Sequence, residues 1–389
     1  MSLRYLTAGE SHGKALTGIM DGMPSGLSIS VKEIEEQLQR RKLGFGRGAR
    51  QKIETDAVEI ISGIRFGKTL GSPICLMIQN KDASAWKTIM ESEPYVGPVQ
   101  REVIIPRPGH ADLVGGIKYH HSDMRNVLER ASARETAIRV GLASIVRKML
   151  SELGISIGSR VVQIGSVRDE SEMGISVNRL NSMADLSPVR CTQDQITEVM
   201  IAEVEHAKKA GDTLGGIFEI YASGVPAGLG SYSQWDRRLE GAISKALMSL
   251  NAVKGVEIGL GFQAGRSRGS TFHDEIFVGS QPGYVRYQTN SAGGIEGGMS
   301  TSQPIVVRAS MKPLATLMKP LRSVNLKTSE PELAHIERSD VCAVPAAAVI
   351  GESLLAFVLA EAVLEKFGGD SMEELSGRVQ LWKQACPIE

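Results

Sequence analysis

Apolar residues recur with the spacing of an α-helix in five segments of the chain, and residues that start or stop helices bound most of them. The clearest start is Ser30, because Ser30 and Glu33 have the spacing of a capping box. The last segment is apolar on nearly every side, which predicts that most of its surface is buried. The predicted helices cover residues 30–41, 127–153, 194–209, 233–250 and 353–367.

Short runs of apolar and β-branched residues lie between these helices, bounded by Gly, Pro and Ser. The runs cluster and often have hairpin spacing, whereas the strands of a doubly wound sheet alternate with helices. The pattern therefore favours an α+β fold with antiparallel sheets. The predicted strands cover residues 4–7, 57–61, 74–78, 161–164, 216–222 and 305–309.

Two sequence signatures occur twice in the same order. Residues 22–27 (GMPSGL) match residues 224–229 (GVPAGL), an offset of 202 residues. Residues 63–74 match residues 294–305 with the same spacing from Gly to Pro, at an offset of 231 residues. Chance coincidence of Gly and Pro is the alternative, but two ordered matches favour an internal duplication.

We interpret residues 1–389 as one domain made of two similar halves related by a pseudo-twofold axis. The halves are expected at about residues 1–150 and 205–367, with residues 151–204 as a connecting segment and residues 368–389 as a C-terminal tail. A ligand site is expected at the junction of the halves, lined by loops from both.

The charges of the chain balance, because Lys and Arg together number 44 and Asp and Glu together number 44. This balance argues against a general nucleic-acid binder, which needs an excess of cations. Arg outnumbers Lys by 26 to 18, and guanidinium groups suit the bidentate capture of phosphate and carboxylate. Ordinary surface ion pairs are the alternative explanation of the arginine content.

The cysteines and the apolar runs indicate the cellular compartment in which the protein is expected. The four cysteines lie far apart with no Cys-x-x-Cys pattern, so neither a disulfide framework nor a zinc site is expected. The N-terminus shows no signal-peptide core, and Pro345 interrupts the apolar run Val341–Ile350. We therefore expect a cytoplasmic protein with reduced thiols that binds no metal and no membrane.

Two histidines lie in turns that present their side chains to a ligand. His12 lies within residues 9–13 (GESHG), and His110 lies within the rigid turn of residues 107–112 (RPGHAD), beside Arg107. An imidazole titrates near neutral pH and can give a proton to a leaving oxygen. A turn histidine without a chemical role is the alternative for His12.

Arginines gather around glycines at the exit of the first predicted helix, within residues 40–50. Glycine-rich backbone with interleaved guanidinium groups is typical of an anion cradle. The candidates are Arg41, Arg47 and Arg50, and a solvated linker is the alternative.

A second group of charges follows later in the chain. Arg130 and Arg134 are four residues apart and are expected on one helical face, although neighbouring glutamates could simply neutralise them. Asp340, near Arg338, is expected to stay ionised and to act as a base. The residues alone thus indicate an enzyme for a small phosphorylated or carboxylated anion, with His and Asp as proton carriers.

Five motifs in order resemble the chorismate synthase family over residues 1–367. They are GESHG at 9–13, RPGHAD at 107–112, ERASARET at 129–136, GGIEGG at 293–298 and ERSD at 337–340. The resemblance implies conversion of 5-enolpyruvylshikimate 3-phosphate to chorismate and phosphate by a 1,4-anti elimination with reduced FMN. It also implies a β-α-β sandwich of two antiparallel sheets around a helical layer, assembled as a homotetramer.

The resemblance further implies roles for individual residues. His12 would protonate the departing phosphate, His110 would face the N1/C2 edge of the flavin, and Asp340 would help to remove the ring proton. The residues expected to bind the substrate are Arg41, Arg47, Arg50, Arg107, Arg134 and Arg338. The residues expected to contact FMN are Arg130, Ala131, Ser132, Asn251, Ala252, Gly297, Lys312, Pro313, Leu314, Ala315, Thr316 and Arg338.

Two alternatives to this interpretation are open. The protein could reduce its own flavin with NADPH, as bifunctional relatives do, but the chain shows no nicotinamide fingerprint. We therefore expect NADPH to act only indirectly, through an external flavin reductase. A non-catalytic scaffold with the same fold is the second alternative, and the presence of His12, His110 and Asp340 argues against it.

Overall fold

The computed structural model describes residues 3–48, 54–171, 176–337 and 339–388.

The N-terminal strands form a four-stranded antiparallel sheet. Leu16, Gly18 and Met20 alternate with more exposed neighbours along the second strand, so one face of the sheet points into the core. In spatial order the strands are β1 (Arg4–Ala8), β2 (Ala15–Asp21), β6 (Ile74–Gln79) and β3 (Val58–Ser62).

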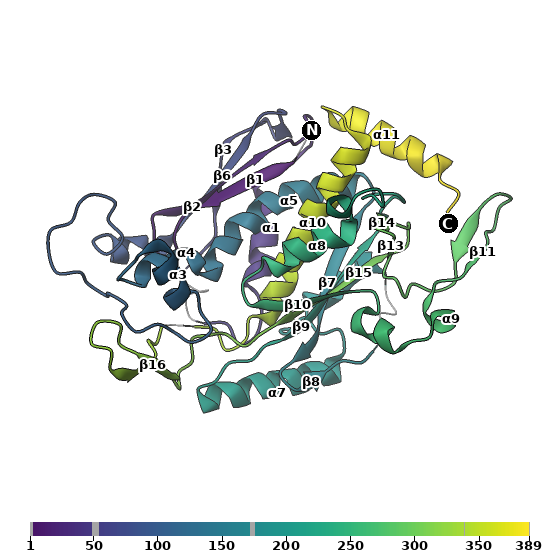
Figure 1. Ribbon diagram of the computed structural model, residues 1–389. Helices are drawn as coiled ribbons and strands as arrows, with labels where there is room; N and C mark the ends of the chain where they lie inside the picture. Colours follow the sequence, from purple (N-terminus) through teal and green to yellow (C-terminus); the bar gives the residue numbers. More distant parts are fainter. Residues whose placement is uncertain (1–2, 49–53, 172–175, 338, 389) are drawn as a thin grey trace.

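A second antiparallel sheet of five strands lies on the other side of the molecule (Figure 1). The strands β15 and β9 pair along their whole length, so they form the centre of this sheet. In spatial order the strands are β10 (Val253–Ile258), β15 (Ile305–Met311), β9 (Gly216–Ser223), β7 (Ser156–Ile164) and β8 (Val167–Arg168).

Helices fill the space between the two sheets (Figure 1). The longest, α10, is buried on nearly every side, and 94% of its most apolar window lies inside the protein. Its apolarity, which is sufficient for a membrane span by composition, is therefore explained by its position in the core. The helices of this layer are α1 (Val31–Lys42), α5 (Thr136–Glu152), α8 (Leu239–Met248) and α10 (Val344–Phe367).

The remaining elements lie around the sandwich. Short 3-10 helices and small hairpins connect the larger elements. The 3-10 helices are η1 (Lys81–Trp86), η2 (Ala133–Glu135), η3 (Trp235–Arg237) and η4 (Gly261–Arg266). The other helices are α3 (Asp112–Tyr119), α4 (Arg125–Ala131), α6 (Val177–Ala184), α7 (Asp194–Ala210), α9 (Gly269–Phe272) and α11 (Met372–Ala385). The paired short strands are β4 (Ile64–Arg65) with β5 (Lys68–Thr69), β11 (Ile276–Val278) with β12 (Val285–Tyr287), β13 (Ile295–Glu296) with β14 (Met299–Ser300), and β16 (Arg322–Val324) with β17 (Pro331–Leu333).

The predicted mixed fold with antiparallel sheets is confirmed, and so is the capping box of α1. The Ser30 side chain accepts from the Glu33 backbone N–H, and the Glu33 carboxylate accepts from the Ser30 backbone N–H. Three strands of the two main sheets, β2, β8 and β10, were not predicted, and neither were the strands of the small hairpins. Helix α10 begins nine residues before the predicted start, because Pro345 lies in its first turn, where a missing N–H costs no hydrogen bond.

The prediction of one continuous helix over residues 127–153 is wrong. Helix α4 ends at Ala131, Ser132 has an extended backbone (φ −64°, ψ 142°), and the 3-10 helix η2 (Ala133–Glu135) leads into α5. The Ser132 side chain accepts a hydrogen bond from the backbone N–H of Arg134, which satisfies one donor at the new start. Arg130 and Arg134 therefore do not share a helical face.

The two repeated signatures have matching environments. Met20 pairs with Ile74 between β2 and β6, and Ala222 pairs with Ile305 between β9 and β15, at the offsets of the sequence matches. The order β1-β2-β6-β3 thus has a counterpart in β7-β9-β15-β10. In this correspondence β7, which lies in the expected connecting segment, occupies the place of β1.

The loops of the two repeated signatures, at residues 22–27 and 224–229, also make matching hydrogen bonds. Thr69 Oγ1 accepts from the Leu27 N–H at 3.0 Å and donates to the Pro24 carbonyl at 2.6 Å. Ser300 Oγ accepts from the Leu229 N–H at 2.9 Å and donates to the carbonyl of residue 226 at 2.6 Å. The two loops are therefore closed by the same pair of bonds.

A buried carboxylate, Glu352 of α10, holds three guanidinium groups inside the helical layer. Arg40 of α1 donates to both of its oxygens, at 2.8 and 3.0 Å. Arg147 of α5 and Arg190 also bind it, and Ser159 of β7 donates to it at 2.5 Å. Burial alone would raise the pKa of Glu352, but the three arginines outweigh burial and lower that pKa far below its usual range.

We predict that Glu352→Gln destabilises the protein by about 3–5 kcal/mol, because it leaves buried guanidiniums without a balancing charge. Unfolding in urea at pH 7 measures the effect. The matched control on the same helix is Glu365→Gln, because Glu365 pairs with Arg237 where both side chains are 53% exposed. The control should change stability by less than about 0.5 kcal/mol, and equal losses in the two variants would contradict the prediction.

The stabilisation by Glu352 should also depend on pH. Since the pKa of Glu352 is lowered on folding, its contribution is complete above the unfolded value of about 4.3 and is lost as the pH falls below it. The stability difference between the wild type and Glu352→Gln should therefore shrink as the pH falls below about 4. A difference that grows in acid would contradict this assignment.

Candidate active site

His12 is buried, 8% exposed, between a carboxylate and an aromatic ring. Its Nδ1 lies 2.9 and 3.0 Å from the two carboxylate oxygens of Glu129, and its backbone N–H donates to the same group at 2.8 Å. Its ring stacks on Trp86 of η1 (Lys81–Trp86), with centroids 3.8 Å apart and planes inclined by 19°. The imidazole is thus fixed in orientation.

Glu129 lies on α4 within a buried charge cluster. Arg125, one turn earlier, donates to Glu129 at 3.0 Å and to Glu337 at 3.0 Å. Burial alone would raise the pKa of Glu129, but the hydrogen bonds and charges of His12 and Arg125 lower it below its usual value. Glu129 is therefore ionised at neutral pH.

The turn that contains His12 is attached to the end of α4. Arg130 donates to the carbonyls of Thr7 and Gly9, at 3.0 and 3.1 Å. The Ser11 hydroxyl donates to Ser132 Oγ at 3.1 Å. The break in the helix at Ser132 thus places hydroxyl and guanidinium groups against the glycine-rich turn.

Arg134 and Arg41 meet at a second buried carboxylate, Asp56. Arg134 donates to Asp56 and, at 3.0 Å, to the side-chain oxygen of Asn80. Asn80 in turn donates to the Gly13 carbonyl at 2.8 Å, so it joins this arginine to the turn of His12. Arg41 Nη1 lies 3.6 Å from Asp56 without a hydrogen bond within the described part of the chain.

Arg47 pairs with Asp340, whose two oxygens lie 2.8 Å from Arg47 Nη1 and 2.6 Å from the Gly48 backbone nitrogen. Arg47 Nε is buried and makes no hydrogen bond among residues 3–48, 54–171, 176–337 and 339–388. Burial lowers the pKa of Arg41 to about 10; Asp56 opposes this shift, and the charges of Arg47 and Arg134 add to it. These guanidiniums therefore lie close together, as an anion cradle requires. The predicted Arg50 and Arg338 lie outside the described residues.

His110 belongs to a separate buried triad. Its Nδ1 contacts Asp112, and Arg107 donates to both oxygens of Asp112 at 2.8 and 3.1 Å. A further Arg107 donor reaches the Thr316 hydroxyl at 2.8 Å. Burial alone would raise the pKa of Asp112, but His110 and Arg107 hold it well below its usual range. Arg107 is therefore already bonded to protein groups, whereas the His110 side chain is 21% exposed.

Residues 251–252 connect the two histidine-bearing regions. Asn251 donates to the Ala131 carbonyl at 3.0 Å, and the Ala252 carbonyl accepts from the Lys312 backbone N–H at 2.9 Å. The Lys312 ammonium donates to the Gly109 carbonyl. A continuous series of hydrogen bonds thus runs from α4 to the turn of His110.

The other predicted cofactor residues lie in two places. Leu314 and Ala315 are half-buried and follow Lys312, and an ideal Cβ on Gly109 would lie 3.8 Å from Ala315. Pro313 is exposed beside them. Gly297 is exposed in the β13–β14 hairpin, whose next residue, Gly298, bonds to Leu239. The β13–β14 hairpin that carries Gly297 lies on the opposite side of the molecule from α3 and α4 in Figure 1.

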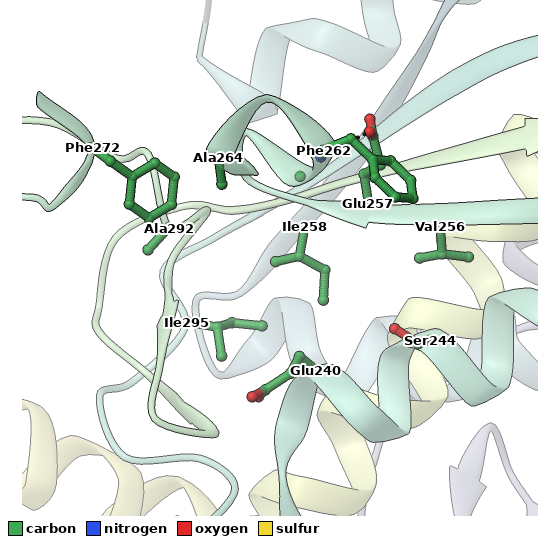
Figure 2. Close-up of a pocket in the computed structure, with 11 residues that line it drawn as sticks. Glu240, Ser244, Val256, Glu257, Ile258, Phe262, Ala264, Phe272, Ala292 and Ile295 are labelled. Atoms are coloured by element: carbon green, nitrogen blue, oxygen red, sulfur yellow. Dashed lines mark hydrogen bonds between the residues drawn. The ribbon is translucent and has the colours of Figure 1, made fainter. Parts of the chain in front are cut away.

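Two open hollows, of about 510 and 640 Å³, lie elsewhere on the molecule. Figure 2 shows the smaller one, between α8, β10 and α9, with Phe262 and Ile258 in its wall. None of the predicted site residues lines either hollow. Helices α3 and α4, next to which the turns of His110 and His12 lie, are at the other end of the molecule from α9 in Figure 1.

Several residues of this region had no role in the sequence analysis. Glu129 was considered only as a charge that could neutralise an arginine, and Asp112 only as part of a motif. Their proximity in sequence to Arg130 and His110 was the available signal. Asp56, Asn80 and Trp86 come from segments without a motif, and only the fold brings them to the histidine and arginine side chains.

The fold and the site define an enzyme class: a mixed α+β protein whose connected loops hold arginine–carboxylate pairs and two oriented histidines. Such a site suits a small anionic substrate and proton transfer.

Comparison with known proteins identifies the family. The family model described as chorismate synthase matches residues 3–364. The chain is 52% identical over 382 residues to chorismate synthase of Desulforamulus reducens, with 98% of each chain covered. It is 54% identical over 373 residues to that of Desulforudis audaxviator, covering 96% of this chain and 95% of the relative. A crystal structure of chorismate synthase superimposes with a TM-score of 0.79 at 41% identity, covering 100% of this chain and 99% of the other. The chain therefore belongs to the chorismate synthase family.

We predict that Asp112→Asn lowers the free energy of unfolding by about 3–5 kcal/mol, because a buried guanidinium loses its charged partner. Thermal and urea unfolding measure the loss. The matched control is Asp21→Asn, since Asp21 pairs with Arg4 at the surface, with side chains 38% and 78% exposed. The control should change stability by less than about 0.5 kcal/mol. A wild-type stability in Asp112→Asn would show that Arg107 does not need this carboxylate.

Proposed function

We propose that this protein converts 5-enolpyruvylshikimate 3-phosphate to chorismate and phosphate by a 1,4-anti elimination, as a carbon–oxygen lyase (EC 4.2.3.5) in the shikimate pathway of aromatic amino acid biosynthesis. The observation that carries the proposal is the family match over residues 3–364. The geometry supports it, because oriented histidines and clustered guanidiniums occur on connected loops.

The substrate carries two carboxylates and a phosphate, so its site needs several cationic donors. Arg41 Nη1 and Arg47 Nε are buried without hydrogen bonds within the described residues, and both are available to an incoming anion. Arg134 lies beside Arg41 across Asp56. We assign these three arginines to the substrate, together with Arg50 and Arg338 by the family resemblance. The family resemblance also assigns Arg107 to the substrate, and its bonds to Asp112 orient the carboxylate that contacts His110.

We assign the two proton transfers of the reaction to His12 and Asp340. Loss of phosphate builds negative charge on an oxygen, and a proton from His12 Nε2 lowers the cost of that charge. Asp340 is held in place by Arg47 and by the Gly48 N–H, and its carboxylate would accept the ring proton. His12 is thus the general acid and Asp340 the base of this proposal.

The residues also fit reduced FMN, whose phosphate and ring edges need donors. The connected segments supply amide, hydroxyl, ammonium and imidazole groups. The residues that would hold the cofactor are Arg130, Ala131, Ser132, Asn251, Ala252, Lys312, Pro313, Leu314, Ala315, Thr316 and, from the resemblance, Gly297 and Arg338. When bound, reduced FMN supplies an electron and recovers it, so the elimination has no net redox change. His110, oriented by Asp112, would present its exposed edge to this group.

We further infer the setting of the enzyme. The family resemblance supports a cytoplasmic homotetramer that receives reduced FMN from an external flavin reductase. We also infer that the chain arose by duplication, with a pseudo-twofold relation between its halves. The matching strand order and the matching Thr69 and Ser300 hydrogen bonds support this inference. On this correspondence the second half begins at β7, earlier than residue 205.

We predict that His12→Ala lowers the rate by about 10²–10⁴-fold, because the departing phosphate loses its proton donor. Anaerobic release of phosphate from 5-enolpyruvylshikimate 3-phosphate with reduced FMN measures the rate. His206→Ala is the matched control, since His206 is exposed on α7 and is none of the proposed site residues. A His12→Ala rate within threefold of wild type would remove His12 from the mechanism.

The source of reduced flavin can be tested separately. We expect no oxidation of NADPH when the purified protein is mixed with FMN in air, and full activity when FMN is reduced chemically. NADPH oxidation that requires the protein would instead favour the bifunctional alternative.

A further inference from the structure

We propose that Glu129 is the positioning residue of His12: its carboxylate holds the Nδ1 proton, favours the imidazolium form and directs Nε2 toward the substrate. The inference rests on the proposed role of His12 as general acid. It adds a residue to the mechanism that touches neither the substrate nor the cofactor and acts only through His12.

One carboxylate fixes both the ring and the backbone of His12. Glu129 accepts from the His12 backbone N–H at 2.8 Å, and both of its oxygens lie within 3.0 Å of Nδ1. The Glu129 carbonyl also accepts from the Ser11 N–H at 2.9 Å. The Trp86 ring closes one face of the imidazole. The ring therefore has a single orientation, with Nδ1 toward α4.

The chemistry of the acceptor determines where the protons lie. An ionised carboxylate only accepts hydrogen bonds, so Nδ1 must carry a proton. A second proton on Nε2 then makes the imidazolium, which the adjacent negative charge stabilises. Glu129 is 1% exposed in its side chain, so water screens this attraction very little.

Other charged groups around the pair do not cancel this effect. Arg125 binds Glu129, but it also binds Glu337 at 3.0 Å, so two carboxylates share its charge. His335 lies 3.1 Å from Glu337 and not against Glu129. The guanidiniums of Arg101 and Arg125 lie 4.3 and 5.0 Å from the centre of the Trp86 ring, which attracts cations. Glu129 thus retains negative charge for His12.

In the elimination proposed above, the carbon–oxygen bond breaks with its electron pair on the phosphate oxygen, and that oxygen takes the Nε2 proton of His12. The ring carbon–hydrogen bond gives its proton to Asp340 and its electron pair to the new double bonds, so the elimination balances with no net redox change. The imidazole is left neutral, with its Nδ1 proton still on the side of Glu129. Orientation by a carboxylate that does not itself become protonated is the arrangement used in serine hydrolases.

The test compares Glu129→Gln with wild type in the full-length protein. Phosphate release with reduced FMN is followed anaerobically from pH 5.5 to 9. Glutamine keeps the size and one acceptor but removes the charge, so the high-pH fall of kcat should move down by about one pH unit or more. At pH 7.5 kcat should fall about 10- to 100-fold, with KM for the substrate within threefold of wild type.

A purely structural role for Glu129 predicts a different result. If the pH profile of Glu129→Gln coincides with wild type, and only KM or thermal stability changes, the proposal is wrong. The matched control is Glu135→Gln, because Glu135 is also buried but pairs with Arg139 and not with His12. Its pH profile should coincide with that of wild type.

His12→Ala separates this proposal from the proposed function. If His12→Ala keeps its activity, the role of His12 fails. If His12→Ala loses activity while the profile of Glu129→Gln is unchanged, only the role of Glu129 fails. The double variant should be no slower than His12→Ala, because both changes remove the same interaction.

Two measurements keep the proposal testable if Glu129→Gln does not fold. Glu129→Asp retains the charge and should keep the high-pH fall within about half a pH unit of wild type, with a lower kcat. In ¹⁵N-histidine-labelled wild type at pH 7, a downfield Nδ1–H signal should be present that vanishes in His12→Ala, whereas any signal from the His110–Asp112 pair should remain in that variant. Absence of that signal from wild type would overturn the proposal.

Discussion

The placement of the site depends on the attraction between one carboxylate and three guanidiniums inside the protein. Glu352 binds Arg40, Arg147 and Arg190, and so joins α10 to α1, to α5 and to the second sheet through Ser159. The next residue, Arg41, instead lies 3.6 Å from Asp56 and donates to the carbonyl of residue 133. The same turn of α1 thus places one arginine in the helical layer and the next in the candidate site, so the ion pair that holds Arg40 also helps to position Arg41.

Arginines of the candidate site are also paired with carboxylates, in places nearer to solvent. Arg107 faces Asp112, and Arg47 faces Asp340, so carboxylates of the protein balance much of the positive charge in the candidate site. Such pairs keep the guanidiniums oriented in a partly buried place.

The sequence predicted most of the scaffold but only part of the site. Helix limits were readable where a local signal existed, as with Ser30 before α1. The break at Ser132 was not readable, because apolar periodicity continues across it and contacts with the turn of His12 favour it. Motifs identified the histidines and arginines, since these types are unusual in glycine-rich turns. Their partners Asp56 and Trp86 were missed, because a carboxylate or an indole becomes part of a site only through distant chain segments that the fold brings together.

The apolarity of α10 has a consequence for the synthesis of the protein on the ribosome. Exposed alone, this helix has the length and composition of a membrane span. Its partners α1, α5 and both main sheets precede it in the chain, and N-terminal segments fold first during translation. The surfaces that cover α10 are therefore already made when it emerges. A circular permutant that began with α10 would present this segment uncovered to the insertion machinery and to neighbouring nascent chains.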